Sequence, residues 1–236
     1  MLHGKRFLAV VPARGGSKGV ELKNLHPLRG KPLLLHTVEL IRSCPWLDRT
    51  VVSTDSEQIA AVAETAGLAA PFRRPEALSG DRIGDWDVLS HALVEMEAKD
   101  GHPYDFVLML QPTCPLREAD QVAQTAVKAA LEGWDAVWTV SPTDLKYHPL
   151  KALSVGPDGR LGYFDPRSAG IVARQQLAPV YHRNGAAYVI SRECLLGQCT
   201  ILGQRSACVV IEQPMVSIDT LEDFARVESI MAWCGG

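Results

Sequence analysis

The sequence predicts an α/β protein with a mostly parallel sheet covered by helices on both faces. Short apolar runs of strand length alternate with segments in which apolar residues recur at helical spacing. The apolar runs do not alternate strictly with polar residues, which is typical of strands buried on both sides. A chain of 236 residues is also long enough to form one such domain with its own core.

The elements follow one another in a regular order along most of the chain. Strands are expected at residues 7–11, 50–53, 106–110 and 136–140. Helices are expected around residues 34–41, 59–66, 88–96 and 122–130, each with an apolar stripe, and a last helix around residues 221–233.

Residues 141–180 break this rhythm, because five prolines and the turn Pro157-Asp158-Gly159 interrupt the periodicity. So long an irregular excursion is uncommon in a compact domain unless it is functional or docks on another surface. We therefore predict a single domain, residues 1–236, with an insertion at 141–180.

Charge and composition exclude several classes of protein. Asp and Glu number 27 and Lys and Arg 24, which gives a net charge of −3, and hydrophobic residues make up 47% of the chain. This balance argues against binding to nucleic acid through overall positive charge. No segment approaches the ~20 apolar residues of a membrane span, and the first apolar run is too short for a signal sequence. We expect a cytoplasmic protein that acts on small molecules and binds neither nucleic acid nor membrane.

A basic, glycine-rich loop follows the first expected strand. Residues 12–19 read Pro-Ala-Arg-Gly-Gly-Ser-Lys-Gly, and Lys23 and Asn24 come shortly afterwards. Glycines allow successive backbone N–H groups to face one anion, and Arg14, Lys18 and Lys23 add positive charge. Because ligands bind at the carboxyl ends of parallel strands, the loop predicts a polyphosphate site. It lacks both the Walker A and the G-x-G-x-x-G patterns, and a flexible surface loop is the alternative.

This loop closely resembles the signature of the acylneuraminate cytidylyltransferases, which activate sialic acids and related nonulosonic acids as CMP-sugars. Other blocks resemble the family in the same order along the chain. They are Ser53-Thr54-Asp55, Arg74-Pro75 with Asp81, Gln111-Pro112-Thr113-Cys114-Pro115-Leu116-Arg117, His148-Pro149-Leu150-Lys151, Arg174-Gln175-Gln176, Asn184-Gly185-Ala186-Ala187-Tyr188, and Ser217-Ile218-Asp219-Thr220 with Asp223. Cys114 stands where the family usually has serine.

The resemblance implies a three-layer, Rossmannoid nucleotidyltransferase-like fold in which residues 141–180 form the contact of a homodimer. The implied reaction converts CTP and a nonulosonic acid to CMP-sugar and pyrophosphate with Mg²⁺. The sugar hydroxyl attacks the α-phosphorus in line, so catalysis depends on positioning and on neutralising charge. N-acetylneuraminate, KDN, legionaminate and pseudaminate all fit the motifs. The alternatives are a cytidylyltransferase for 3-deoxy-manno-octulosonate and a catalytically silent nucleotide-binding protein.

The resemblance also implies roles for individual residues. Catalytic roles fall to Arg14, Lys23 and Asp219. Nucleotide binding falls to Ala13, Arg14, Gly15, Gly16, Ser17, Lys18, Lys23, Asn24, Arg74 and Asp81, the last two in the base-recognition segment. Sugar binding falls to Gln111, Lys151, Arg174 and Tyr188, and metal binding to Asp219 and Asp223.

Three of these assignments have structural alternatives. Gln111 could tie down the turn after its strand, and Lys151 could be a solvated lysine. Asp219 and Asp223 also belong to a pattern that predicts the N-terminal cap of the last helix, and the two roles can coexist. Several relatives carry Asp-x-Asp where this chain has Ser217-Ile218-Asp219, so a second metal carboxylate would have to come from Asp223.

Overall fold

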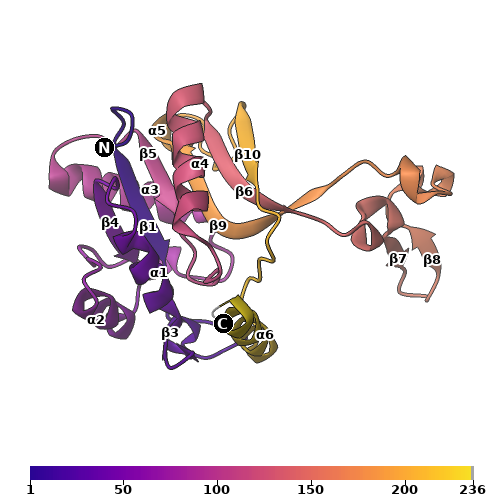
Figure 1. The fold of residues 1–236 in the computed structure, drawn as a ribbon, viewed down its shortest axis with the longest axis horizontal. Helices are drawn as coiled ribbons and strands as arrows, with labels where there is room; N and C mark the ends of the chain where they lie inside the picture. The colour runs from indigo at the N-terminus through magenta and orange to yellow at the C-terminus, as the bar shows by residue number, and fades with distance from the viewer. Residues whose placement is uncertain (235–236) are drawn as a thin grey trace.

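The computed structural model describes residues 1–234 and has a six-stranded sheet at its centre, in the order β10-β6-β9-β5-β1-β4 (Figure 1). The strands are β1 (Phe7–Pro12), β4 (Arg49–Ser53), β5 (Phe106–Met109), β6 (Ala136–Pro142), β9 (Tyr181–Ser191) and β10 (Ser206–Val210). β1 pairs in parallel with β4 and β5, and β10 pairs in parallel with β6. The predicted strands and the mostly parallel sheet are confirmed.

Strand β9 is the exception to the parallel order, because it runs antiparallel between β5 and β6. It was not among the expected strands, although its residues 184–190 are buried at the centre of the sheet. Its buried part begins with Asn184-Gly185, and the short apolar run that follows at residues 186–190 was not assigned to a strand. The edge strand β10 was also missed, and it is only partly covered.

Helices cover both faces of the sheet. They are α1 (Leu33–Arg42), α2 (Glu57–Thr65), α3 (Asp85–Asp100), α4 (Ala119–Glu132), α5 (Arg192–Leu196) and α6 (Leu221–Cys234). Ala9 of β1 packs in one apolar cluster with residues of α1, α2 and α4. Val10, the next residue, packs in a second cluster with residues of α3 and α5. Because neighbouring strand residues face opposite sides, these clusters define the two helical layers and confirm the three-layer fold.

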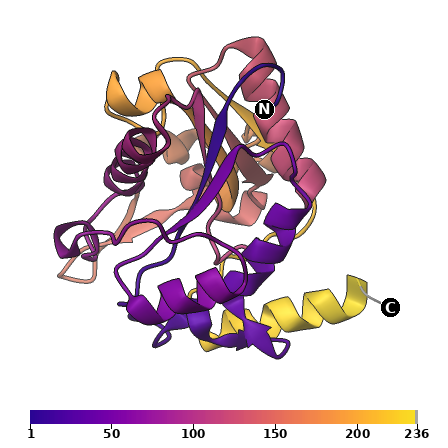
Figure 2. The same ribbon diagram turned by 90° about the vertical axis from the view of Figure 1, so that its left-hand side faces the viewer.

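Helix α6 does not lie on either face of the sheet but below its lower end (Figures 1 and 2). Phe224 and Val227 of α6 pack with Val20 and Leu28 in a third apolar cluster. The short elements η1 (Lys23–Leu25), β2 (Pro27–Leu28) and β3 (Lys31–Pro32) belong to the same region. The C-terminal part of the chain is thereby brought next to the loop that follows β1.

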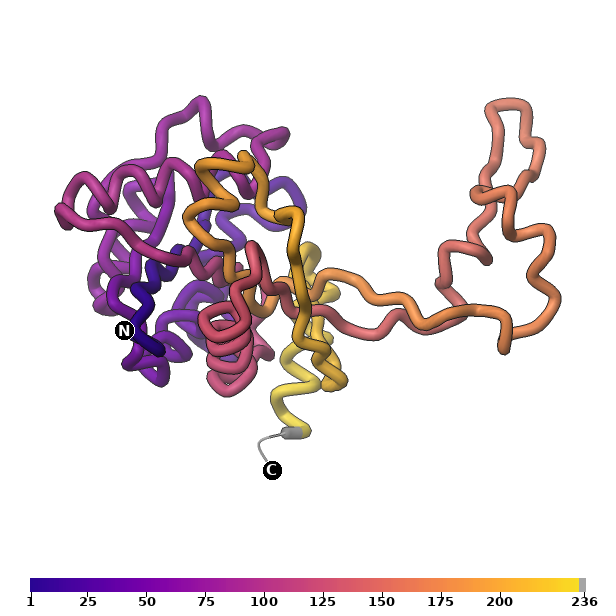
Figure 3. The backbone as a smooth tube through the Cα atoms, turned by 90° about the horizontal axis from the view of Figure 1, so that it is seen from above, coloured from indigo at the N-terminus to yellow at the C-terminus, as the bar shows by residue number. Residues whose placement is uncertain are grey.

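Residues 141–180 leave the sheet as an extended arm (Figures 1 and 3). Its two legs continue β6 and β9, and the Thr143 N–H donates to the Val180 carbonyl at 2.9 Å. The arm contains the hairpin β7 (Leu153–Val155) and β8 (Leu161–Tyr163), and the short helices η3 (Leu145–Tyr147), η4 (Pro149–Lys151), η5 (Pro166–Gly170) and η6 (Arg174–Gln176). Across residues 1–234, no helix combines the length and apolar character needed to cross a membrane.

Candidate functional site

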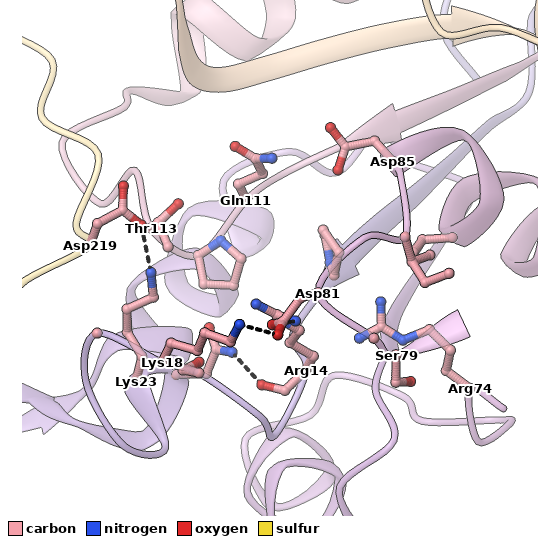
Figure 4. Close-up of a pocket in the computed structure, with 18 of the residues that line it drawn as sticks. Arg14, Lys18, Lys23, Arg74, Ser79, Asp81, Asp85, Gln111, Thr113 and Asp219 are labelled. Atoms are coloured by element: carbon pink, nitrogen blue, oxygen red, sulfur yellow. Dashed lines mark hydrogen bonds and ion pairs between the residues drawn. The ribbon is translucent and has the colours of Figure 1, made fainter. Parts of the chain in front are cut away.

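A cavity of about 590 Å³ lies at the carboxyl ends of β1 and β5 (Figure 4). It is bordered by the glycine-rich loop, by the segment that includes η2 (Glu76–Leu78) and the start of α3, and by the stretch just before α6. The structure brings together these predicted site residues in its lining: Arg14, Ser17, Lys18, Lys23, Asn24, Arg74, Asp81, Gln111 and Asp219. Ala13 is buried, and Gly15 and Gly16 belong to the same loop without lining the cavity.

The glycine-rich loop is attached to the protein at both ends. The Gly15 N–H donates to Asp55 Oδ1 at 2.9 Å. At the other end, Gly19 lies so close to the Asp219 carbonyl that a Cβ atom would overlap it. Asn24 adds a third contact by donating from Nδ2 to the Arg14 carbonyl at 3.1 Å. Glycine is therefore required at position 19 by close backbone approach.

The cations of the loop are paired with carboxylates. Arg14 Nη1 lies 2.8 Å from Asp81 Oδ1, and Lys18 Nζ lies 2.5 Å from Asp81 Oδ2. Lys23 Nζ contacts Asp219 Oδ1 at 2.8 Å and donates to the Ile218 carbonyl. Hydrogen bonds from Lys18 and Arg14 hold the pKa of Asp81 below its ordinary value. Exposed ion pairs of this kind contribute little stability, so a more highly charged anion can replace Asp81 at small cost.

Arg74 is the buried cation of the cavity wall, with 5% of its surface exposed. Its backbone N–H donates to the Thr54 carbonyl at 2.9 Å, which joins it to the end of β4. Among the described residues, its Nε and Nη2 have no hydrogen-bond partner. Burial lowers the pKa of Arg74, an effect that Asp55 partly opposes. Because unpaired buried donors are costly, this guanidinium is suited to the acceptors of a ligand.

Gln111 lies at the end of β5, where its side chain lines the cavity (Figure 4). Gly185 has a φ of +75°, and a Cβ at that position would lie 2.9 Å from Gln111 Oε1. Arg117 donates to the Ala186 carbonyl at 2.9 Å, to Thr37 Oγ1 at 2.7 Å and to the Gln111 carbonyl. Burial lowers the pKa of Arg117 to about 10, which leaves it a cation at neutral pH. Arg117 thus fixes the two backbone segments that flank the Gln111 side chain.

The remaining predicted sugar contacts do not line this cavity. Tyr188 is buried behind it, where its hydroxyl accepts from the Gly185 N–H at 3.0 Å and its ring packs on Trp138. Lys151 and Arg174 lie in η4 and η6 and do not line the cavity. Both short helices belong to the arm, which extends away from the body of the chain (Figure 3). A single chain therefore does not bring these two residues to Gln111.

The two predicted metal carboxylates have different surroundings. Asp223 Oδ2 accepts from the backbone N–H of Asp219 at 3.0 Å and of Thr220 at 2.8 Å. Thr220 Oγ1 in turn accepts from the Asp223 N–H at 3.3 Å, so these two residues form the cap of α6. The backbone hydrogen bonds lower the pKa of Asp223. The Asp219 side chain is 73% exposed and lines the cavity.

Three residues that sequence reasoning missed also contribute to this region. They are Asp55, which holds the glycine-rich loop, Arg117, which supports Gln111, and Asp85, which lines the cavity from the start of α3. Asp55 and Arg117 were quoted as parts of motifs but were not assigned to the site. Asp85 follows the Arg74–Asp81 segment closely in the sequence, and this proximity was the available signal.

A protein-family model described as cytidylyltransferase matches residues 8–230 of this chain. The chain belongs to the cytidylyltransferase family. This cytidylyltransferase is 31% identical over 229 residues to the CMP-N,N'-diacetyllegionaminic acid synthase of Legionella pneumophila, with 96% of each chain covered. It is 30% identical over 222 residues to the N-acylneuraminate cytidylyltransferase of Escherichia coli. That match covers 93% of this chain and 50% of the longer Escherichia coli protein.

A solved structure supports the fold of this cytidylyltransferase independently. CMP:2-keto-3-deoxy-manno-octonic acid synthetase in complex with CTP matches with a TM-score of 0.71, over 97% of this chain and 99% of that one. At 17% sequence identity the similarity establishes the shared fold alone.

The Arg117 contacts lead to a test of its structural role. We expect Arg117→Met to lower the free energy of unfolding by about 2–4 kcal/mol, because it leaves buried carbonyl groups without donors. Urea denaturation measures the loss. Arg192→Met is the matched control, since Arg192 pairs with Glu97 at the surface, and we expect it to cost less than about 1 kcal/mol. Equal losses in the two variants would contradict this role.

Proposed function

We propose that this cytidylyltransferase converts CTP and a nonulosonic acid to a CMP-sugar and pyrophosphate. The observation that carries the proposal is the cavity itself, which unites the cations of the glycine-rich loop with Gln111 and Asp219 at one end of the sheet. Its volume of about 590 Å³ lies within the usual range for a small-molecule site. The relatives from Legionella pneumophila and Escherichia coli, both named for nonulosonic acids, support the same substrate class.

The triphosphate is assigned to the glycine-rich loop. Arg14, Lys18 and Lys23 line the cavity and supply positive charge, and the Ser17 hydroxyl in the same lining is a further donor. On binding, the phosphates replace the Asp81 carboxylate as partners of Arg14 and Lys18. The base is assigned to the other end of the cavity, where Arg74 has unpaired donors.

The sugar is assigned to the space beside Gln111, between the nucleotide and Asp219. Its anomeric hydroxyl attacks the α-phosphorus, the new P–O bond forms, and pyrophosphate leaves with the electrons of the broken bond. Arg14 and Lys23 stabilise the negative charge that spreads over the phosphate oxygens in the transition state. Rigid positioning by Arg117 and Gly185 keeps the Gln111 amide in place to orient the sugar.

The donor set around Asp219 fits Mg²⁺. Lys23 occupies Oδ1 of Asp219, which lines the cavity, and Oδ2 has no hydrogen bond to any residue in the described range 1–234. Within residues 1–234 no group of three or more His, Cys, Asp and Glu side chains converges on a possible metal position. Mg²⁺ is commonly held by one carboxylate together with substrate phosphates and water, so Asp219 with the phosphates suffices. When bound, the metal would neutralise charge on the phosphates and lower the pKa of the attacking hydroxyl.

The main alternative is a cytidylyltransferase for 3-deoxy-manno-octulosonate, with which the fold shared with the CMP:2-keto-3-deoxy-manno-octonic acid synthetase is compatible. The much higher sequence identity to the nonulosonate relatives argues for the nine-carbon class. Lys23 and Asp219 in direct contact inside the cavity argue against a catalytically silent protein.

Pyrophosphate release tests the proposed reaction. With CTP and Mg²⁺, we expect turnover with at least one of N-acetylneuraminate, KDN, legionaminate and pseudaminate, and much less with 3-deoxy-manno-octulosonate. Removal of Mg²⁺ by a chelator is expected to stop the reaction. Failure with every nine-carbon acid would overturn the substrate class, and a preference for ATP or UTP would overturn the nucleotide.

The different surroundings of Asp219 and Asp223 predict opposite phenotypes. We expect Asp219→Ala to fall below about 1% of wild-type turnover with an unchanged melting temperature, since its carboxylate faces the cavity. Asp223→Ala is expected to retain turnover but to lose about 0.5–2 kcal/mol of unfolding free energy with its helix cap. Near-normal turnover in the Asp219 variant would remove it from the metal site.

We further propose that the arm at 141–180 forms a homodimer and delivers Lys151 and Arg174 to the cavity of the second chain. The arm exposes large apolar side chains, among them Phe164 at 71% and Val172 at 89%. Apolar surface of this extent marks an interaction site. Arginine is well suited to the carboxylate of an acid sugar, because its planar fork binds both oxygens.

Sedimentation velocity tests the dimer. We expect the wild type to sediment as a dimer and the double variant Phe164→Asp, Val172→Asp to sediment as a folded monomer that binds CTP but turns over poorly. Leu131→Asp places the same charge on an exposed leucine of α4 and is expected to remain dimeric. A monomeric wild type, or a dimeric double variant, would contradict the proposed interface.

A further inference from the structure

The arm has almost no interior of its own. Of residues 143–180, only His148, Ser168 and Leu177 are buried, with exposed fractions of 4%, 3% and 7%. A segment with so little buried apolar surface gains little from packing, so its internal shape depends on hydrogen bonds. Among these three buried side chains, His148 has the ring that makes such bonds in two directions.

The His148 ring holds η4 and the returning leg of the arm at the same time. The Leu150 N–H donates to His148 Nδ1 at 3.0 Å and caps η4, and the Lys151 N–H donates to the His148 carbonyl at 2.8 Å. Because Nδ1 accepts, the proton is on Nε2, which donates to the Ala178 carbonyl at 3.1 Å. The ring is therefore neutral in this arrangement, and both of its nitrogens are used.

The bond to Ala178 links the two halves of the arm. Ala178 comes shortly after η6, whose first residue is Arg174. Between residues 144–151 and residues 174–179, all of which the structure describes, the bond from His148 is the only hydrogen bond. One ring therefore sets how η4 lies relative to the end of η6.

Lys151 and Arg174 are the unpaired cations of the arm. Within the described residues 1–234, neither side chain forms an ion pair, whereas every other charged side chain of residues 143–180 has a local partner. These pairs, at 3.4, 3.1 and 2.6 Å, are Asp144–Lys146, Asp158–Arg160 and Asp165–Arg167. Since no carboxylate of the chain orients Lys151 and Arg174, their arrangement depends on the backbone that carries them.

We propose that His148 is a positioning residue, which fixes Lys151 relative to Arg174 so that both meet the same acid sugar in the cavity of the second chain. Each of the two ring bonds holds the backbone of one of the two short helices. Held in this way, the two cations lose little conformational freedom when the sugar binds. This inference rests on the proposed function, in which the arm delivers Lys151 and Arg174.

Protonation of the His148 ring is expected to undo this arrangement. The second proton enters at Nδ1, so Nδ1 no longer accepts from the Leu150 N–H and η4 loses its cap. The imidazolium is then buried without counter-charge, because within residues 1–234 no carboxylate forms an ion pair with His148. The charged and titratable side chains on and beside η3 to η6 are Asp144, Lys146, Tyr147, Lys151, Asp165, Arg167 and Arg174. Sugar binding is therefore expected to weaken as the pH falls.

Steady-state kinetics at saturating CTP test the inference, with the sugar varied over about pH 5 to 8, the range in which histidine changes charge. The sugar is whichever of N-acetylneuraminate, KDN, legionaminate and pseudaminate gives the highest turnover. His148→Gln keeps a donor for Ala178 but no acceptor for Leu150, and His148→Asn keeps the acceptor but not the donor. At neutral pH we expect each variant to raise the KM for the sugar about threefold to tenfold, with kcat and the Kd for CTP within about twofold.

The pH profile separates positioning from a merely structural role. The wild type loses the Leu150 bond on protonation, whereas His148→Gln lacks it at every pH. We therefore expect the sugar KM values of the two proteins to converge within about twofold at the acidic end. In a Lys151→Met background, His148→Gln is expected to raise the KM by no more than about twofold, because the residue it positions is gone.

His182→Gln is the matched control. His182 is exposed near the base of the arm, where its Nδ1 lies 2.9 Å from Thr143 Oγ1 and a backbone hydrogen bond from Thr143 to Val180 joins the same two legs. We expect this variant to keep the sugar KM and the pH profile of the wild type. Circular dichroism melts and sedimentation velocity establish that each variant is folded and has the oligomeric state of the wild type.

Several outcomes would overturn the inference. They are an unchanged sugar KM in both His148 variants, a ratio of KM values to the wild type that stays constant with pH, and a full effect of His148→Gln in the Lys151→Met background. Monomeric His148 variants would also overturn it, by showing a role in assembly. A normal sugar KM in Lys151→Met would refute the delivery by the arm, and with it this inference. A wild type that turns over no nine-carbon acid would instead refute the proposed reaction.

Discussion

The glycine-rich loop is held between segments from distant parts of the chain, and the rest of the site depends on this constraint. Asp55, at the end of β4, accepts from the Gly15 N–H, and the backbone at Asp219 lies directly against Gly19. The parallel sheet brings β1 next to β4, while α6 packs below the sheet and carries Asp219 to the loop. The loop is therefore preorganised by the fold, and little backbone ordering remains to oppose ligand binding.

Local pairing of charge explains how a protein of net charge −3 can bind a polyanion. The cations of the loop are each matched by a carboxylate, Arg14 and Lys18 by Asp81 and Lys23 by Asp219. These pairs hold the cations at the cavity, and the two Asp81 pairs add little stabilising free energy because they are partly exposed. A triphosphate carries more charge than a single carboxylate and can take over the Asp81 pairs. The global charge balance gives no sign of this arrangement.

Most of the strands and helices could be predicted from the sequence, because strands such as β1 are continuous apolar runs and helices such as α4 have clear apolar stripes. The central strand β9 could not, since its first half, as far as Asn184 and Gly185, is mostly polar and its burial comes from neighbours far away in the sequence. Candidate site residues that lie within local sequence motifs could be named because the motif itself is visible in the sequence, as it is for the glycine-rich loop. The places of Asp85 and Arg117 in this region depend on how distant parts of the chain fold together. Arg117, for example, donates to the Ala186 carbonyl, 69 residues away in the sequence.

Buried polar groups in this protein fall into two kinds, and the difference lies in their hydrogen bonds. Arg117 directs both Nη atoms to backbone carbonyls and a threonine hydroxyl, so it has little left to offer a ligand and serves the scaffold. Arg74 keeps two donors free within a cavity wall, and Asp85 keeps its acceptors free on the same side. Unpaired buried donors such as those of Arg74 carry a desolvation cost, which a ligand with hydrogen-bond acceptors would offset. Under the proposed function, we therefore expect a ligand to bond to the protein on this side of the cavity.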